Sequence, residues 1–170
     1  MNNIFLIGMM GSGKTTIGKQ LSNQLDREFI DIDQDLESIN NMSISDIFND
    51  FGEHKFREME MAYFIEKTKE KNKIFSTGGG IILKKENREA LISRGITFFL
   101  ESDCNILLNR IKDIKSRPVL SNSNNSKSIH DIWQERKEYY YSSCNHIINV
   151  EQSSISDITN TIIKILDANE

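Results

Sequence analysis

Residues 8–15 read Gly-Met-Met-Gly-Ser-Gly-Lys-Thr. This stretch matches the pattern G-x-x-x-x-G-K-[ST] at every defined position. The apolar run Asn3–Ile7 before it predicts a buried strand, and the apolar residues at every fourth position of Thr15–Leu25 predict a helix. A glycine-rich loop between a strand and a helix is typical of phosphate-binding sites, and this context disfavours a chance glycine-rich turn.

The chemistry of phosphate binding explains these residue types. Glycines let successive backbone N–H groups turn toward phosphate oxygens, and the N-terminus of the helix adds a favourable dipole. We expect Lys14 to reach the β- and γ-phosphates of a bound nucleotide and the Thr15 hydroxyl to bind Mg²⁺. The expected nucleotide-binding residues of this segment are Gly11, Ser12, Gly13, Lys14, Thr15 and Thr16.

Composition places the chain among globular proteins. Its 170 residues, 38% hydrophobic and 27% charged, are typical of one folded domain spanning 1–170. The net charge of −4 disfavours nucleic acid as a partner, and no apolar run approaches the roughly 18 residues of a membrane span. Cys104 and Cys144 form no CxxC pair, and no basic segment precedes the first apolar run. We therefore expect reduced thiols, no secretory signal and a cytoplasmic location.

The rest of the chain alternates short apolar runs with helical patterns. The expected strands are Glu28–Ile32, Lys73–Thr77, Ile96–Leu100 and His146–Val150. One helical region is expected from Ser43 to about Lys71, with an interruption near Gly52. Further helices are expected at Asn87–Arg94, after a cap at Ser102 or Asp103, at Ile129–Ser142 and at Ser156–Ala168. Strands that alternate with helices predict an α/β fold with a parallel sheet.

Two carboxylates, Asp31 and Asp33, stand two residues apart where the second strand is expected to end. Side chains at i and i+2 of a strand share a face, and the carboxyl ends of parallel strands border the ligand crevice of such folds. One carboxylate would belong to the Mg²⁺ shell, and the other would accept the proton of a substrate hydroxyl. The alternative interpretation is a solvated acidic turn.

The arginines are informative because there are seven of them against fourteen lysines. Arg57 and Glu60 are three residues apart on an expected helix. By itself, this spacing favours an ion pair between them at the surface. The alternative is that Glu60 holds Arg57 so that its guanidinium binds a carboxylate. Arg136 stands among charged neighbours and by position alone is a surface residue. Tyr139–Tyr141 beside it indicate packing.

Two further segments point to a ligand. Gly78–Gly80 follow the third expected strand, where three glycines have a high entropic cost and no packing use. They indicate close approach of the backbone to a ligand, with an ordinary loop as the alternative. Ser116–Ser128 is polar and predicts a mobile surface loop. Its Arg117 is either a solvated loop charge or an arginine that swings over a transferring phosphate.

Taken in order, these segments resemble the shikimate kinase family nearly end to end. The family pattern is a phosphate loop, D-x-D, F-R-x-x-E, G-G-G, R-P-[LV]-L and a downstream arginine. It stands here as GMMGSGKT, Asp31-Ile-Asp33, Phe56-Arg57-Glu-Met-Glu60, Gly78–Gly80, Arg117-Pro118-Val119-Leu120 and Arg136. Only the phosphate loop is specific by itself, but six motifs in order are strong evidence. The departures are Val119 where leucine is commoner and a Ser/Asn-rich loop.

The resemblance implies ATP-dependent phosphorylation of the shikimate 3-hydroxyl, on the pathway to chorismate and the aromatic amino acids. It implies a three-layer P-loop kinase fold with a five-stranded parallel sheet in the order 2-3-1-4-5. A substrate-binding segment near residues 33–61 and a mobile lid near 112–128 would complete a single domain. The expected partners are shikimate, ATP and one Mg²⁺ ion, and the expected state is a monomer.

The resemblance also assigns roles to single residues. The implied catalytic residues are Lys14, Asp33 and Arg117, and the implied shikimate-binding residues are Asp33, Arg57, Gly78, Gly79, Gly80 and Arg136. Arg110, against the adenine, and Arg117 would join the ATP site. Thr15 would bind Mg²⁺ directly and Asp31 through water.

Two rival functions remain at this point. A gluconate kinase-like enzyme would share the phosphate loop and the fold, but the D-x-D, F-R-x-x-E and G-G-G motifs together argue against it. A nucleotide-dependent switch protein would carry the guanine-reading motif N-K-x-D. The only Asn-Lys pair, at Asn72-Lys73-Ile-Phe75, lacks the aspartate.

Overall fold

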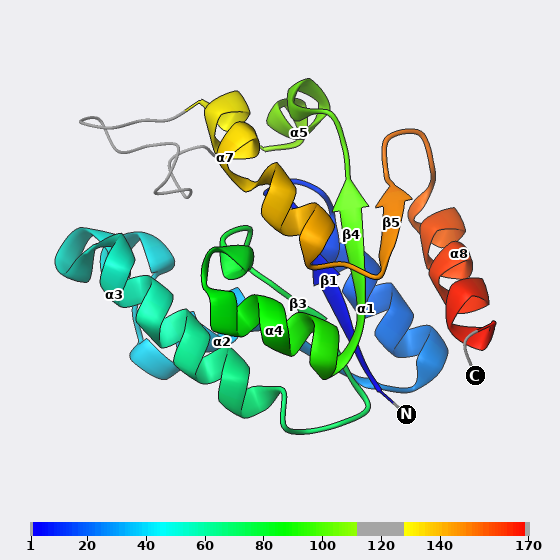
Figure 1. Cartoon of the computed structure of the whole chain (residues 1–170), viewed down its shortest axis with the longest axis horizontal. Helices are drawn as coiled ribbons and strands as arrows, with labels where there is room; N and C mark the ends of the chain where they lie inside the picture. Colours follow the sequence, from blue (N-terminus) through cyan, green and yellow to red (C-terminus); the bar gives the residue numbers. More distant parts are fainter. Residues whose placement is uncertain (1, 112–127, 169–170) are drawn as a thin grey trace.

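The structure is a computed structural model that describes residues 2–111 and 128–168. Its centre is a five-stranded sheet in the order β2-β3-β1-β4-β5, with every neighbouring pair parallel (Figure 1). The strands are β1 (Asn3–Ile7), β2 (Glu28–Asp31), β3 (Lys73–Ser76), β4 (Gly95–Glu101) and β5 (His146–Asn149). The predicted fold class and strand order are confirmed.

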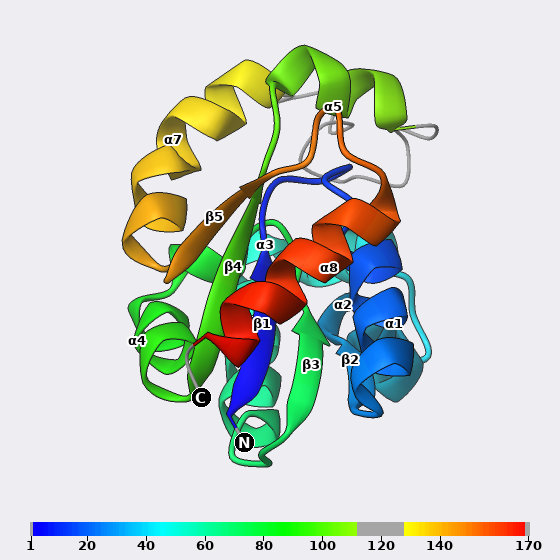
Figure 2. The same cartoon turned by 90° about the vertical axis from the view of Figure 1, so that its right-hand side faces the viewer.

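Helices cover both faces of the sheet. Helices α1 (Lys14–Leu25) and α8 (Ile155–Asp167) lie together on one face, where α8 crosses in front of the sheet in Figure 2. The others are α2 (Ile32–Asn40), α3 (Ile44–Lys67), the 3₁₀ turn η1 (Ile81–Leu83), α4 (Lys85–Ser93), α5 (Cys104–Arg110) and α7 (Ile129–Ser142). Of these, α3, α4 and α7 lie on the opposite face (Figure 1). Within the two described ranges, no helix has both the length and the apolar character that a membrane crossing requires.

The central strand β1 is buried on both faces, which explains its continuous apolar sequence. Phe5 and Ile7 belong to one apolar cluster with side chains from α3, α4 and α7. Ile4 and Leu6 point the other way, into a second cluster with side chains of α1 and α8. Because β1 joins both clusters, the loop that follows it starts from a rigid position.

The structure corrects the expected boundary after the second strand. β2 ends at Asp31, and the next residue already begins α2, a helix that the sequence pattern did not predict. The side chain of Asp31 is the reason, because it accepts a hydrogen bond from the backbone N–H of Gln34 and so caps the helix. Asp31 and Asp33 therefore do not share the face of one strand. Instead, Asp31 is the last residue of β2 and Asp33 lies in the first turn of α2.

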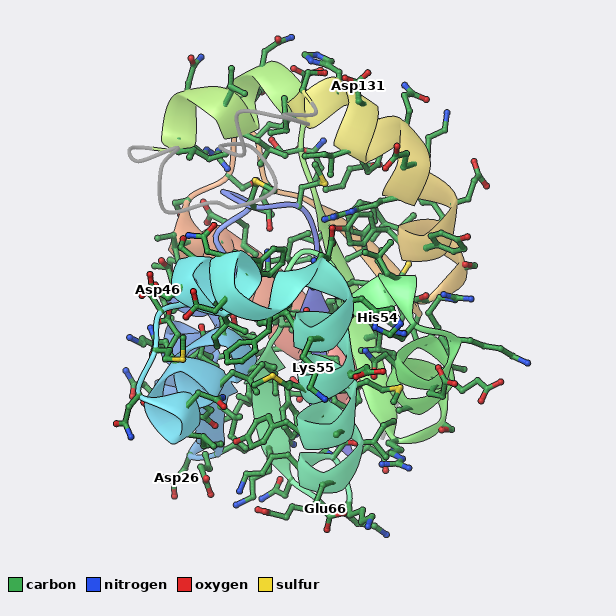
Figure 3. All side chains as sticks on the ribbon, turned by 90° about the vertical axis from the view of Figure 1, so that its left-hand side faces the viewer. Asp26, Asp46, His54, Lys55, Glu66 and Asp131 are labelled. Atoms are coloured by element: carbon green, nitrogen blue, oxygen red, sulfur yellow. The ribbon has the colours of Figure 1, made fainter. Side chains whose placement is uncertain are left out.

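The long helix α3 has the expected interruption. Gly52 has φ 80° and ψ 164°, outside the helical region, and it divides the helix into two arms. Figure 3 shows these arms at an angle, with Asp46 on the first and Lys55 and Glu66 along the second. The second arm ends at Lys67, short of the expected Lys71. The predicted mobile lid and its Arg117 lie outside the described residues.

Asn3 ties the start of the sheet to the end of α3. Its amide, 1% exposed, donates to the carbonyls of Glu70 at 2.7 Å and Thr68 at 3.3 Å. Its side-chain oxygen accepts the backbone N–H of Lys73 at 3.0 Å. One side chain thus satisfies three backbone groups of the segment that leads from α3 into β3.

We expect Asn3→Ala to lower the free energy of unfolding by about 2–3 kcal/mol, because buried backbone groups lose their partners. Urea unfolding at equilibrium measures this change. Asn2→Ala is the matched control, because Asn2 is exposed, and we expect it to change stability by less than about 0.5 kcal/mol. Equal effects of the two substitutions would show that Asn3 does not anchor this segment.

Candidate active site

The phosphate loop has the backbone geometry that its glycines permit. Gly8, Gly11 and Gly13 have φ values of 148°, 81° and 90°, which other residues rarely adopt. A Cβ atom on Gly8 would also lie 2.7 Å from the carbonyl oxygen of Leu100. Gly13 starts α1 without any side-chain cap, so the positive end of that helix faces the loop.

Lys14 lies within the loop and is 9% exposed. Its ammonium donates to the carbonyl oxygens of Gly8 and Met9, each at 2.9 Å, and to the Ser12 hydroxyl at 3.4 Å. The loop borders a cavity of about 220 Å³. Of the six residues of this segment that were predicted to bind the nucleotide, five line this cavity, namely Gly11, Gly13, Lys14, Thr15 and Thr16, while Ser12 is buried.

Three oxygen-bearing side chains that line this cavity are in contact with one another. The Thr15 hydroxyl donates to Asp31 Oδ2 at 2.7 Å, and it lies 3.3 Å from the Ser76 hydroxyl. Hydroxyl and carboxylate oxygens are the ligands that Mg²⁺ accepts. Ser76 was not predicted as a site residue; its place at the end of the strand beside β1 is the only signal in the sequence.

The described part of the chain holds no group of three or more His, Cys, Asp or Glu residues that could bind a metal. Mg²⁺ is commonly held by one or two protein ligands together with phosphate oxygens and water, without a cage of protein side chains. Thr15 and Asp31 would supply two such protein ligands for Mg²⁺.

Asp33 lies in the first turn of α2, with one carboxylate oxygen close to Gly78. A Cβ atom on Gly78 would lie 2.7 Å from Asp33 Oδ1 and 2.8 Å from Glu60 Oε1. Asp31 is buried, at 8% exposure, and both aspartates line the cavity beside Lys14. The interpretation as a solvated acidic turn is therefore wrong for Asp31, while Asp33 is half-buried.

Arg57 is buried, and the interpretation as a surface ion pair is wrong. Its Nη1 lies 2.8 Å from Glu60 Oε2 and its Nη2 lies 3.2 Å from Glu53 Oε1. Arg57 is 7% exposed, and Glu60 is fully buried. Burial by itself lowers the pKa of Arg57, but the Glu60 and Glu53 carboxylates outweigh it and the pKa lies above its usual value. The guanidinium is thus held charged between its two partners.

Arg136 is buried as well, at 5% exposure, so its position among charged neighbours was misleading. Helix α7 carries it, and α3 carries Arg57 on the same face of the sheet (Figure 1). The Arg136 guanidinium donates to the carbonyl oxygen of Gly79 at 3.1 Å. Gly80 packs against Arg57, because a Cβ atom there would lie 2.2–2.4 Å from its guanidinium atoms.

The two arginines line a second cavity of about 300 Å³, within the size range of roughly 300–1,000 Å³ that ligand sites occupy. Asp33 and the three glycines Gly78–Gly80, which the resemblance assigned to the substrate, line it too. Its apolar wall was not predicted, because apolar residues of a helix look like core in the sequence. That wall consists of Met10, Ile44, Phe48 and Phe56. The rings of Phe48 and Phe56 also lie under the Arg57 guanidinium, 5.7 and 5.1 Å from it.

Arg110 is not brought into either cavity. Its guanidinium donates to the carbonyl oxygens of Val150 at 3.0 Å and Glu151 at 3.4 Å, just after β5. Its predicted contact with adenine stays a prediction.

Comparison with known proteins gives consistent matches. The family model described as Shikimate kinase matches residues 10–167. The chain is 41% identical to a shikimate kinase of Buchnera aphidicola subsp. Schizaphis graminum over 166 residues, covering 97% of this chain and 96% of that protein. A shikimate kinase of Vibrio parahaemolyticus is 36% identical, with 97% and 96% coverage.

Solved structures agree on the fold. The shikimate kinase from Acinetobacter baumannii in complex with shikimate has a TM-score of 0.94 at 34% identity, covering 100% of this chain and 95% of that one. A gluconokinase from Sinorhizobium meliloti has a TM-score of 0.57 at 14% identity, covering 99% and 97%, which shows a shared fold only.

Substitution of Gly80 tests whether its close contact holds the Arg57 guanidinium in position. We expect Gly80→Ala to displace the Arg57 guanidinium from Glu60 and to lower the free energy of unfolding by about 1–3 kcal/mol, as overpacking does. Gly79→Ala is the matched control, because its Cβ atom would have no neighbour nearer than 3.5 Å. A crystal structure and urea unfolding of each variant measure the two effects. An undisturbed Arg57 in Gly80→Ala would contradict this packing.

Proposed function

The chain belongs to the shikimate kinase family, and we propose that it transfers the γ-phosphoryl group of ATP to the 3-hydroxyl of shikimate. The observation that carries this proposal is the junction of the two cavities. Met10, Thr15, Asp31, Asp33 and Gly79 line both of them. An acceptor in the arginine-lined cavity therefore lies next to a phosphate held by the loop, as in-line transfer requires.

The arginine-lined cavity suits a small carboxylic acid. Arg57 and Arg136 reach it from different helices, and a guanidinium binds a carboxylate through two parallel hydrogen bonds. Around them the protein has a net charge of −4, so positive charge is concentrated where the substrate anion would bind. The apolar wall with Phe48 and Phe56 would pack against the carbon ring of shikimate.

Asp33 would orient the reacting hydroxyl and accept its proton. The hydroxyl oxygen forms a bond to the γ-phosphorus while the bond from that phosphorus to the β-bridging oxygen breaks. ADP leaves with the electron pair of the broken bond. Lys14 would neutralise charge on the β- and γ-phosphates as the bond breaks.

Mg²⁺ would bind at the Thr15 hydroxyl, with Asp31 in contact through water, and would neutralise phosphate charge when bound. The hydrogen bond between Thr15 and Asp31 supports this assignment, because it holds both oxygen ligands together at the wall of the cavity beside Lys14. The role of Ser76 would be to keep the Thr15 hydroxyl in place.

We extend the proposal to the parts of the chain that the cavities do not include. Residues 33–61 would form the substrate-binding segment and 112–128 the lid of a single domain spanning 1–170. Arg117, which is outside the described residues, would contact the transferring phosphate, and Arg110 the adenine. We also propose a monomer, as the resemblance led us to expect, and a cytoplasmic location, as composition and cysteine spacing led us to expect.

A substrate panel tests the proposed reaction. Purified protein with ATP and Mg²⁺ should form ADP rapidly with shikimate and at background rate with gluconate or no acceptor. Rapid ADP formation with gluconate would favour the gluconate kinase-like alternative. ADP formation that does not depend on an acceptor would contradict both kinases and favour a nucleotide-dependent switch.

Truncation of Arg136 tests carboxylate recognition. We expect Arg136→Ala to weaken shikimate binding by at least about 30-fold, since leaving a buried charge unpaired typically costs about 2–5 kcal/mol. Binding of the carboxamide of shikimate should change much less. Arg27→Ala is the control, because Arg27 lines neither cavity. Equal losses for the acid and the amide in Arg136→Ala would show that Arg136 does not bind the carboxylate.

Removing the charge of Asp33 tests its role at the hydroxyl. We expect Asp33→Asn to lower kcat by about 10²–10⁴-fold, the usual effect of losing a general base, while ADP binds as before. Steady-state kinetics and calorimetry measure the two quantities. An unchanged kcat would reduce Asp33 to a structural residue of the α2 turn.

A further inference from the structure

Tyr140 is a wholly buried side chain whose hydroxyl contacts Gly79, one of the three glycines that line the arginine-lined cavity. It lies on α7 one helical turn after Arg136, on the same face of that helix. Its hydroxyl donates to the carbonyl oxygen of Gly79 at 2.5 Å, the same oxygen that accepts a hydrogen bond from Arg136 at 3.1 Å. One peptide carbonyl is thus held by two side chains of α7.

The ring of Tyr140 is fixed to the sheet. It stacks on Phe99 of β4 with ring centroids 5.0 Å apart and an angle of 2° between the planes, and Trp133 stacks near both rings. Burial raises the pKa of Tyr140 to about 12, so the hydroxyl keeps its proton and donates near neutral pH. The position of this donor is therefore set by the core and not by the ligand.

Gly79 lies between this donor and the phosphate loop. The atoms nearest to a Cβ placed on it would be Met10 N at 3.5 Å, Gly8 O at 3.6 Å and the Tyr140 hydroxyl at 3.7 Å. No peptide bond among the described residues is cis, so the Gly79 carbonyl and the Gly80 N–H point in opposite directions across one planar unit. Whatever holds the carbonyl toward α7 also sets the direction of that N–H.

We propose that Tyr140 is a positioning residue for the acceptor site: its hydroxyl holds the Gly79–Gly80 peptide and, through the shared carbonyl, the guanidinium of Arg136 in the orientation that receives a carboxylate. This inference rests on the proposed function. Tyr140 does not itself touch the substrate, because it does not line the arginine-lined cavity. It acts on the two groups beside it that do.

The geometry predicts what losing the hydroxyl does. Tyr140→Phe keeps the ring stack on Phe99 but leaves Arg136 as the only side-chain donor to the Gly79 carbonyl among the described residues. The peptide and the guanidinium then gain freedom to rotate, which must be lost again when a carboxylate binds. The effect should therefore fall on binding of the carboxylate and not on the nucleotide.

The test compares Tyr140→Phe with Tyr141→Phe. The next residue offers a matched control, because the Tyr141 hydroxyl is hydrogen-bonded to Glu101 at the surface and 41% of Tyr141 is exposed. Calorimetry would give the dissociation constants of shikimate, its carboxamide and ADP for the wild-type protein and both variants. Thermal unfolding would show whether each variant is folded.

We expect Tyr140→Phe to weaken shikimate binding about tenfold, the typical worth of one hydrogen bond. Binding of the carboxamide and of ADP should change less than about twofold, and Tyr141→Phe should match the wild-type protein. Equal weakening of the acid, the amide and ADP would show that Tyr140 only stabilises the fold and would overturn the inference. Wild-type affinity for shikimate in Tyr140→Phe would overturn it too.

Binding measurements on the wild-type protein distinguish a failure of this inference from a failure of the proposed function. If the wild-type protein does not bind shikimate, or binds the acid and the amide equally, the proposed function or its carboxylate site is wrong. If it prefers the acid and Tyr140→Phe keeps the same preference, only the role of Tyr140 is wrong.

Discussion

The pairing of β3 with β1 is the constraint on which the site depends. In their parallel register Leu6 lies beside Ser76, and the next residue, Thr77, donates to the Leu6 carbonyl from both its backbone N–H at 3.3 Å and its hydroxyl at 3.0 Å. The pairing therefore continues to the last residue before Gly78. As a result the phosphate loop after β1 and the triple glycine after β3 lie side by side. The cavity beside Lys14 and the arginine-lined cavity therefore share lining residues.

Buried charged side chains form part of the wall of the arginine-lined cavity. Taking Arg57 and Glu60 out of water has an energetic cost that their attraction often fails to repay, so such a pair is weak evidence for stability. Here the pair fixes a guanidinium at the cavity wall, and Glu53 and two phenylalanine rings complete its surroundings. Arg136 is fixed from the other side by the Gly79 carbonyl. A carboxylate would find both guanidinium groups already in place, so little ordering would remain to oppose binding.

Local patterns predicted the strands and the α/β class, the strand order came from the resemblance to a family, and the long-range contacts of the site were predicted much less well. The strands and the phosphate loop follow from short apolar runs and glycine spacing, which need no knowledge of distant residues. Helix α2 was missed because Phe-Ile-Asp-Ile-Asp alternates like a strand, while the cap made by Asp31 converts it to helix at Ile32. Arg136 and Tyr140 depend on a carbonyl about 60 positions away in the chain. Neighbouring residues carry no sign of such a contact, and only the resemblance to a family placed Arg136 at the site.

A crystal structure of this chain with ADP and shikimate would show where the acceptor binds. We expect the shikimate carboxylate within hydrogen-bonding distance of Arg57 and Arg136, and one ring hydroxyl on Asp33 facing the phosphate loop. Shikimate bound with its carboxylate at Lys14, or outside the arginine-lined cavity, would contradict the proposed acceptor site.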